Sequence, residues 1–260
     1  MLQPPLPAVR RATLGVVGAI GFLALWSAAA LTGLTTRRFL PAPWDVLRRF
    51  VELLSDPFAG YTLPQHLLSS LQRFGLGFAA AVVVGIPLGL AMARFRWLDR
   101  LVSPAFDAVR FVAPIAWVPF AALWFGTGIG GPVLIIFTGA FPPVLINTYR
   151  GARQVDLKYL EAAQTLGASH WRTVTQVLLP AAVPSIVAGL RVSAGLGWQS
   201  LVGAELIVAS SGVGYLLVKG QASVSTSTVM SGMIAIGLVG MLIDTVLRRL
   251  QQSIEASHGH

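Results

Sequence analysis

The sequence has no cysteine, which excludes a disulfide framework and thiolate chemistry. Charged residues are scarce, at 11% of 260 residues, against about a quarter in ordinary soluble domains. The two lysines, Lys158 and Lys219, lie outside any GxxxxGK(S/T) pattern, so the chain carries no P-loop. Any ATP would have to be hydrolysed by another subunit. Metal-ligand spacings and dinucleotide-binding glycine patterns are also absent. The scarcity of charged residues excludes an ordinary soluble domain.

Apolar residues are abundant instead and make up 55% of the chain. A bilayer crossing takes about 20 mostly apolar residues, so there is room for about five or six spans and little else. The net charge of +9 invites a nucleic-acid interpretation, but the basic residues occur singly or in pairs between apolar runs. We therefore expect a membrane protein that binds no nucleic acid.

The first half of the chain divides into spans by its apolar runs. Residues 12–36 form an uncharged run of the length of a membrane helix. A signal peptide with a cleavage site near Ala28–Ala30 is the alternative, although its apolar region is usually about 7 to 15 residues long. Residues 37–72 are more polar, and apolar residues at helical spacing over 44–54 predict an amphipathic helix at the outer membrane surface. Residues 74–93 are the next uncharged run, with small residues every fourth position for close helix packing.

In the second half, a short basic loop is expected at 94–100. The stretch 103–149 is too long for one helix, and the glycines of 126–131 divide it into two spans. Prolines interrupt the backbone hydrogen bonds in both. In lipid the freed carbonyls need protein or water, so broken helices mark either a transport path or simple kinks. Residues 209–228 are expected to form a loop, either plain or with a short re-entrant turn, before the last span, which begins at 229.

Several polar side chains within the spans are candidates for a translocation path. Arg191, Trp198 and Glu205 follow one another at heptad spacing, hence on one side of a helix. Ionisable residues in a span usually face the bundle interior or a water-filled cavity, although Arg191 has the alternative of extending to the interface. Asp107 and Arg110, three apart, can pair on a helix face. The candidate path residues are Arg110, Asn147, Arg191, Trp198 and Glu205.

The only long polar interval between strongly apolar runs is 150–184. Apolar residues at 157, 160, 163 and 166 predict a short amphipathic helix. Gly167 can close it in the left-handed conformation, Ser169 can cap a second helix, and Pro180 is expected to end that helix. Two short helices joined at a glycine are typical of a docking element for a soluble partner.

The motif in this interval resembles the EAA loop of bacterial ABC importer permeases. Glu161-Ala162-Ala163 is followed by Gly167 and then by Val177, Leu179 and Pro180; Val177 stands where isoleucine is usual. Further matches to the nitrate, sulfonate and taurine branch, over roughly residues 38–250, are Gly85–Gly89, Leu123–Gly126, Asn147–Tyr149 and Ser211–Tyr215.

The resemblance implies an all-α bundle of about six transmembrane helices with the type I ABC importer permease fold. It implies a homodimer, two partner ATPase subunits that bind ATP and magnesium, and an extracytoplasmic binding protein, with no cofactor in this chain. The substrate would be a small anion such as a sulfonate, taurine or nitrate; another small solute, such as a vitamin precursor, is the alternative. The residues implied in coupling to the ATPase are Glu161, Ala162, Ala163, Gly167, Leu179 and Pro180.

Basic residues give the orientation in the bacterial inner membrane. Placing both termini inside leaves eleven lysines and arginines in the cytoplasm and six outside, and it makes the 150–184 loop cytoplasmic. The expected division is an N-terminal region with the first span (1–36), an external amphipathic segment (37–72), a core of five spans (73–250) and a cytoplasmic tail (251–260).

Two other function classes fit less well. An intramembrane enzyme needs a nucleophile with a base, or paired acids, at membrane depth. The four histidines fall in loops or the tail, and Asp107 and Asp244 lie at span ends without a second acid. A channel that needs no ATPase would leave the docking loop unexplained.

Overall fold

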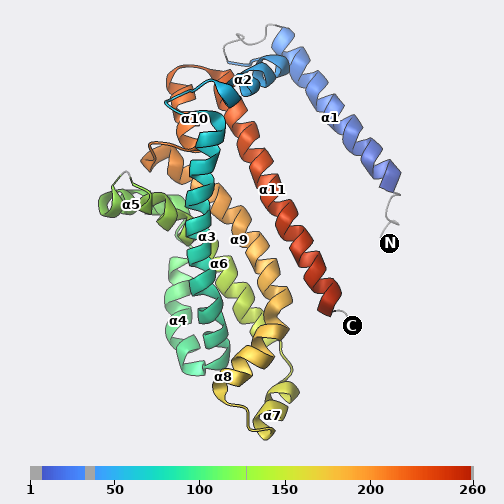
Figure 1. Cartoon of the computed structure of the whole chain (residues 1–260), viewed down its shortest axis with the longest axis vertical. Coiled ribbons are helices and arrows are strands. Elements are labelled where there is room, and N and C mark those ends of the chain that lie inside the picture. Colours follow the sequence, from blue (N-terminus) through green and yellow to red (C-terminus); the bar gives the residue numbers. More distant parts are fainter. Residues whose placement is uncertain (1–7, 33–38, 127, 259–260) are drawn as a thin grey trace. The chain divides into compact units, whose positions relative to one another are not determined.

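The computed structural model describes residues 8–32, 39–126 and 128–258, and in these ranges the protein is built of helices (Figure 1). Their breaks lie at glycine, proline and polar clusters, where the helical hydrogen bonding is most easily interrupted. In chain order they are α1 (Ala8–Leu31), α2 (Pro43–Ser55), α3 (Leu63–Arg94), α4 (Arg96–Val109), the 3₁₀ helix η1 (Pro114–Trp117), α5 (Val118–Phe125), α6 (Gly130–Arg153), α7 (Leu157–Thr165), α8 (His170–Thr173), the π-helical turn η2 (Val174–Leu178), α9 (Leu179–Val208), α10 (Val213–Ala222) and α11 (Thr226–His258).

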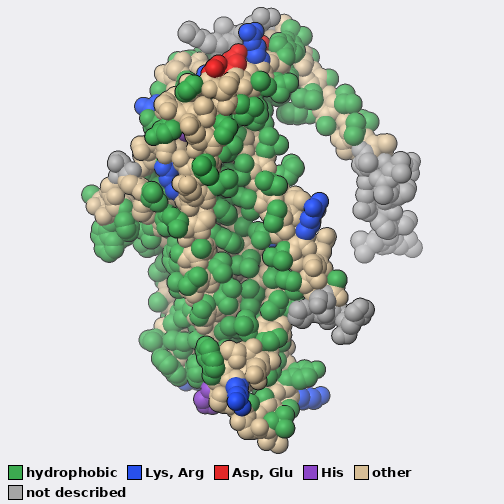
Figure 2. All heavy atoms as spheres, in the orientation of Figure 1, with side chains coloured by type: hydrophobic (Ala, Val, Ile, Leu, Met, Phe, Trp, Pro, Cys, Tyr) green, Lys and Arg blue, Asp and Glu red, His purple; other side chains and the backbone are tan. Residues whose placement is uncertain are grey.

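Five of these helical stretches are long and apolar enough to cross a membrane. They are Thr13–Leu31, Leu63–Arg94, Gly130–Arg153, His170–Val208 and Thr226–Ile254. A sixth span is available if α4 and the η1–α5 stretch count as one crossing, although these two are bent by 89°. Figure 2 shows hydrophobic side chains along the flanks of the long helices, as expected of surfaces that face lipid.

The chain forms two compact units. The first contains residues up to Leu63 together with Leu216–Ile234. Here α2 is amphipathic, as predicted for 44–54: Val46 and Leu53 are fully buried, whereas Arg48 and Glu52 are exposed or partly exposed. Polar bonds fix α2 to the start of α11, from Arg49 Nε to Thr228 Oγ1 at 3.0 Å and from Ser231 Oγ to the carbonyl of Val46 at 3.1 Å.

The second unit contains Pro64–Tyr215 and Ala235–His260. Its centre is α6, which packs between α3 and α9 with small residues at both contacts. A Cβ built on Gly85 of α3 would lie 2.8 Å from a side-chain atom of Val144, and one on Gly189 of α9 would lie 2.5 Å from Asn147. The small-residue ridge predicted on α3 is therefore a helix-packing surface that needs glycine, and Gly189 lets α9 approach α6 in the same way.

Three sequence predictions about boundaries were wrong. The expected basic loop at 94–100 is helical, because the single extended residue Phe95 is enough to separate α3 from α4. The helix does not end at Pro180, which lies in the first turn of α9. There a missing N–H costs little, and the π-helical turn before it adjusts the hydrogen bonding. The expected loop 209–228 contains α10.

Candidate functional site

A pocket of about 550 Å³ lies in the second unit; we call it the central pocket. It is bounded by η1 and the residues before it, by α6 and by α9. Its lining includes the polar residues Arg110, Thr138, Asn147, Gln199 and Ser200, together with Gly139. Its apolar lining residues include Ile115, Pro142, Pro143, Ile146 and Leu196.

Two prolines leave backbone carbonyls of α6 without a donor in residues that line the central pocket. Pro142 and Pro143 lie inside α6 and have no N–H to donate. The carbonyls four residues earlier, those of Thr138 and Gly139, therefore lack their usual helical donor, and both residues line the pocket. This is the pattern expected where a broken membrane helix borders a hydrated path.

The central pocket carries one sign of charge. Arg110 is the only charged side chain among the described residues that line it. Its Nε donates to Asp107 at 2.8 Å, as the i,i+3 spacing predicted, which leaves the two Nη groups for other acceptors. The Asn147 amide donates to the carbonyl of Pro143 at 2.8 Å. Gln199 makes no polar contact with the described part of the chain, so its amide is available to a solute.

The other three candidate path residues lie elsewhere. Arg191, Trp198 and Glu205 do share one side of α9, as the heptad spacing predicted, but that side contacts α3 and α11 instead of the central pocket. Arg191 pairs with Asp244 at 2.6 Å, and the Trp198 indole donates to the carbonyl of Ile236 at 3.1 Å. Arg110 and Asn147 thus both line the central pocket. The three residues at heptad spacing on α9 do not line it.

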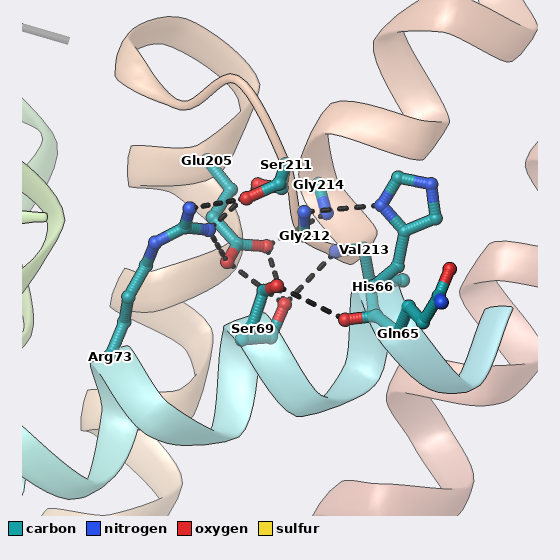
Figure 3. A network of polar contacts seen from close by, with 10 residues as sticks. Gln65, His66, Ser69, Arg73, Glu205, Ser211, Gly212, Val213 and Gly214 are labelled. Atoms are coloured by element: carbon teal, nitrogen blue, oxygen red, sulfur yellow. Dashed lines mark hydrogen bonds and ion pairs between the residues drawn. The ribbon is translucent and has the colours of Figure 1, made fainter. Parts of the chain in front are cut away.

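Glu205 is the centre of a buried polar network (Figure 3). Its carboxylate accepts from Arg73 Nη1 at 2.8 Å and from the backbone N–H of Gly214 at 3.0 Å, and Ser70 Oγ lies 2.8 Å from both of its oxygens. Arg73 also donates to the carbonyl and the hydroxyl of Ser211. The network therefore joins α3, α9 and the turn before α10.

That turn is held by further bonds to α3. The N–H of Val213 donates to Ser70 Oγ at 2.9 Å, and the N–H of Gly212 donates to His66 Nδ1 at 3.1 Å. Gly212 has a φ of +106°, and a Cβ there would collide with the Glu205 carboxylate. Only glycine fits between the acid and the turn.

The predicted two-helix element in the 150–184 loop is formed by α7 and α8, beyond the ends of α6 and α9 (Figure 1). Gly167 has a φ of +72°, which confirms the left-handed conformation expected of it. Ser169 caps α8 by accepting from the N–H of Arg172 at 3.3 Å. Leu179, the first residue of α9, packs in a cluster with Leu90 of α3 and Ile186.

The α7–α8 element exposes apolar surface. Tyr159 is 67% exposed, Leu166 87% and Trp171 75%. Leu166, the last residue of the predicted stripe, lies one residue beyond the end of α7 at Thr165. The Glu161 carboxylate is exposed and has no polar partner in the described ranges. Exposed apolar patches of this kind mark interaction surfaces.

Comparison with known proteins identifies the chain. Residues 85–258 match the model of the family described as binding-protein-dependent transport system inner membrane component. The chain belongs to this family. It is a transport permease subunit of the inner membrane and not an enzyme, and the expected resemblance is confirmed.

Curated relatives match the permease over most of its length. The taurine transport system permease protein TauC of Escherichia coli (strain K12) is 35% identical over 254 residues, 97% of this chain and 92% of that protein. The aliphatic sulfonates transport permease protein SsuC of Bacillus subtilis (strain 168), described as putative, is 35% identical over 233 residues, 89% and 83% of the two chains. The nitrate import permease protein NrtB of Synechocystis sp. (strain PCC 6803) is 33% identical over 220 residues, 83% and 80%.

A solved structure shows the same fold. An inward-facing structure of the MetNI methionine ABC transporter aligns with a TM-score of 0.64 at 17% identity, over 82% of the permease and 98% of that chain. The predicted type I ABC importer permease fold is confirmed.

Sequence reasoning missed two groups of residues. Leu196, Gln199, Ser200 and Gly203 line the central pocket at helical spacing on α9, and that spacing is a signal the sequence offers. The partners of Glu205 on α3, Ser70 and Arg73, carry no local signal, since they are 135 and 132 residues away.

Proposed function

We propose that the permease forms, as a homodimer, the path by which a small anion such as a sulfonate, taurine or nitrate is imported. The observation that carries this is the central pocket, whose only charged lining side chain in the described ranges is Arg110. A guanidinium with free Nη groups beside two amides suits an anion with several acceptor oxygens. The names of the relatives, which include taurine, sulfonate and nitrate permeases, support the same class.

In this proposal, two ATPase subunits that bind ATP and magnesium supply the energy for transport. An extracytoplasmic binding protein delivers the solute. The exposed apolar side chains of the α7–α8 element, Tyr159, Leu166 and Trp171, supply a docking surface for the ATPase. The residues that we assign to coupling are Glu161, Ala162, Ala163, Gly167, Leu179 and Pro180. Both termini and the 150–184 loop lie on the cytoplasmic side.

Replacing Arg110 tests the assignment of the central pocket. Arg110→Gln removes the charge but keeps donors, and we expect uptake at low solute concentration to fall about tenfold or more, since a charge-assisted hydrogen bond contributes about 1.5–3 kcal/mol. Arg100→Gln is the matched control, because Arg100 is exposed on α4, the helix that Arg110 directly follows, and lies outside the pocket. Uptake is measured in vesicles with radiolabelled taurine, sulfate and nitrate. Equal uptake by both variants would remove Arg110 from the path.

The absence of cysteine makes the topology directly testable. Single cysteines replacing the exposed residues Lys158 and Ser253 are expected to react with an impermeant maleimide only after the cells are opened. A cysteine at Gln221, exposed in α10, is expected to react in intact cells. Labelling of the Lys158→Cys variant in intact cells would reverse the proposed orientation.

A further inference from the structure

A second polar pocket of about 370 Å³ lies at the base of the α7–α8 element; we call it the basic pocket. One wall is the ends of α3 and α6 and the first turn of α4, which contribute Arg94, Arg153, Arg96 and Asp99. The α7–α8 element also lines the pocket, with Leu160 of α7 and Thr173 of α8. A ligand in this pocket would contact the membrane spans and the α7–α8 element together.

The acid in the basic pocket is already occupied. Asp99 accepts from Ser103 Oγ at 2.8 Å and from the Tyr149 hydroxyl at 2.9 Å, and Arg153 Nη1 lies 3.5 Å from it. Arg153 in turn donates to the Tyr149 oxygen at 2.6 Å. With these partners, Asp99 offsets the charge of Arg153. It does not neutralise the charges of the other two arginines, Arg94 and Arg96.

The two remaining guanidiniums are not neutralised. Arg94 Nη2 lies 2.7 Å from His170 Nδ1, and because a guanidinium only donates, His170 must accept there as a neutral ring. This bond orients Arg94 but leaves its charge. Arg96 makes no polar contact with the described part of the chain. Three arginines against one acid leave the lining with a net formal charge of +2.

We propose that the basic pocket binds an oxyanion, either a free anion of the size of sulfate or phosphate or the phosphate of an anionic lipid headgroup. Converging guanidiniums with unused N–H groups are the usual recognition elements for such oxygens. Because the pocket is walled by both the spans and the α7–α8 element, the bound anion fixes the position of that element. The site is separate from the central pocket and does not depend on which solute is transported.

The binding test uses the purified full-length chain in an uncharged detergent, with [35S]sulfate retention at low ionic strength as the readout. We expect Arg96→Gln to weaken retention about tenfold, as for the loss of one charge-assisted hydrogen bond. Arg96→Lys is expected to keep most of it. Arg100→Gln, one turn further along α4 and outside the pocket, is expected to bind as the unchanged chain does. Arg110→Gln is expected to keep the part of sulfate binding that depends on Arg96, even if it loses a sulfate bound in the central pocket. The proposal for the basic pocket can therefore fail or hold independently of the proposal for the central pocket.

The lipid source is tested on the same preparations by native mass spectrometry. An anionic phospholipid that stays bound to the unchanged chain and is lost from Arg96→Gln would support the site and identify the lipid as its occupant. Hydrogen exchange in residues 157–173 is expected to slow when either anion is present, but not in Arg96→Gln. The proposal is overturned if neither sulfate nor lipid binding depends on Arg96, or if Arg100→Gln weakens binding equally.

Discussion

Glu205→Ala is expected to lower the free energy of unfolding of the permease by about 3–5 kcal/mol, the usual effect of breaking a buried ion pair from one side. The substitution leaves the Arg73 side chain, 9% exposed, without its carboxylate. The N–H of Gly214 and the hydroxyl of Ser70 lose an acceptor as well. Each buried group without a partner adds its own desolvation penalty.

The matched control is an exposed ion pair. Arg48, whose side chain is 83% exposed, pairs with Glu52 at 3.2 Å, and Arg48→Ala is expected to cost less than about 1 kcal/mol. Thermal unfolding in detergent, followed by the loss of monodisperse protein, compares the two. Arg73→Ala should resemble Glu205→Ala, and the double variant should cost less than the sum of the two single ones. A Glu205→Ala variant as stable as Arg48→Ala would mean that the acid is not held as the structure shows.

Local chemistry made part of this structure predictable from the sequence. Gly167 and Ser169 were predicted correctly because a left-handed turn and a helix cap depend on one or two residues and their neighbours. The glycine ridge of α3 was also correct, since small residues four apart face one way whatever helix they meet. The pairing of Arg110 with Asp107 followed from the i,i+3 spacing alone.

Long-range contacts were not predictable in the same way. Heptad spacing placed Trp198 and Glu205 on one side of α9, but it carries no information on whether that side meets a cavity or another helix. The answer depends on Arg73 and Ile236, which come from α3 and α11. Pro180 was misjudged because its effect on the helix depends on the π-helical turn before it.

Gly167→Asp is expected to leave the permease folded in the membrane and to lower uptake about tenfold or more. A Cβ at this position meets no atom within 4 Å, so the substitution creates no clash in the chain itself. The folded state carries only the backbone penalty of the left-handed conformation, at most about 1–2 kcal/mol, since aspartate is one of the few residues with a side chain that adopt it. The main effect is then on the partner that contacts the α7–α8 element, where a charge and added bulk change the docking surface.

Gly60 offers a matched control. It also has a positive φ, of +90°, with no atom within 4 Å of a built Cβ, but it lies in the first unit. Gly60→Asp therefore introduces a similar strain and the same charge outside the α7–α8 element, and uptake is expected to persist. Gly167→Asn isolates the effect of the charge, since asparagine and aspartate have nearly the same shape and both adopt the left-handed region more readily than other residues with a side chain. We expect it to retain more uptake than Gly167→Asp.

Glu161→Lys is expected to act by the same route. The carboxylate is exposed and has no polar partner in the described ranges, so reversing its charge should not disturb the fold. Coupling requires the ATPase to contact this element differently in its two nucleotide states, because a ligand without differential affinity shifts no equilibrium. A typical coupling free energy of about 1–3 kcal/mol corresponds to about 5- to 150-fold in affinity. Uptake and solute-stimulated ATP hydrolysis, measured on the reconstituted complex, decide the outcome: values equal to those of the unchanged chain for both Glu161→Lys and Gly167→Asp would show that the α7–α8 element does not couple hydrolysis to transport.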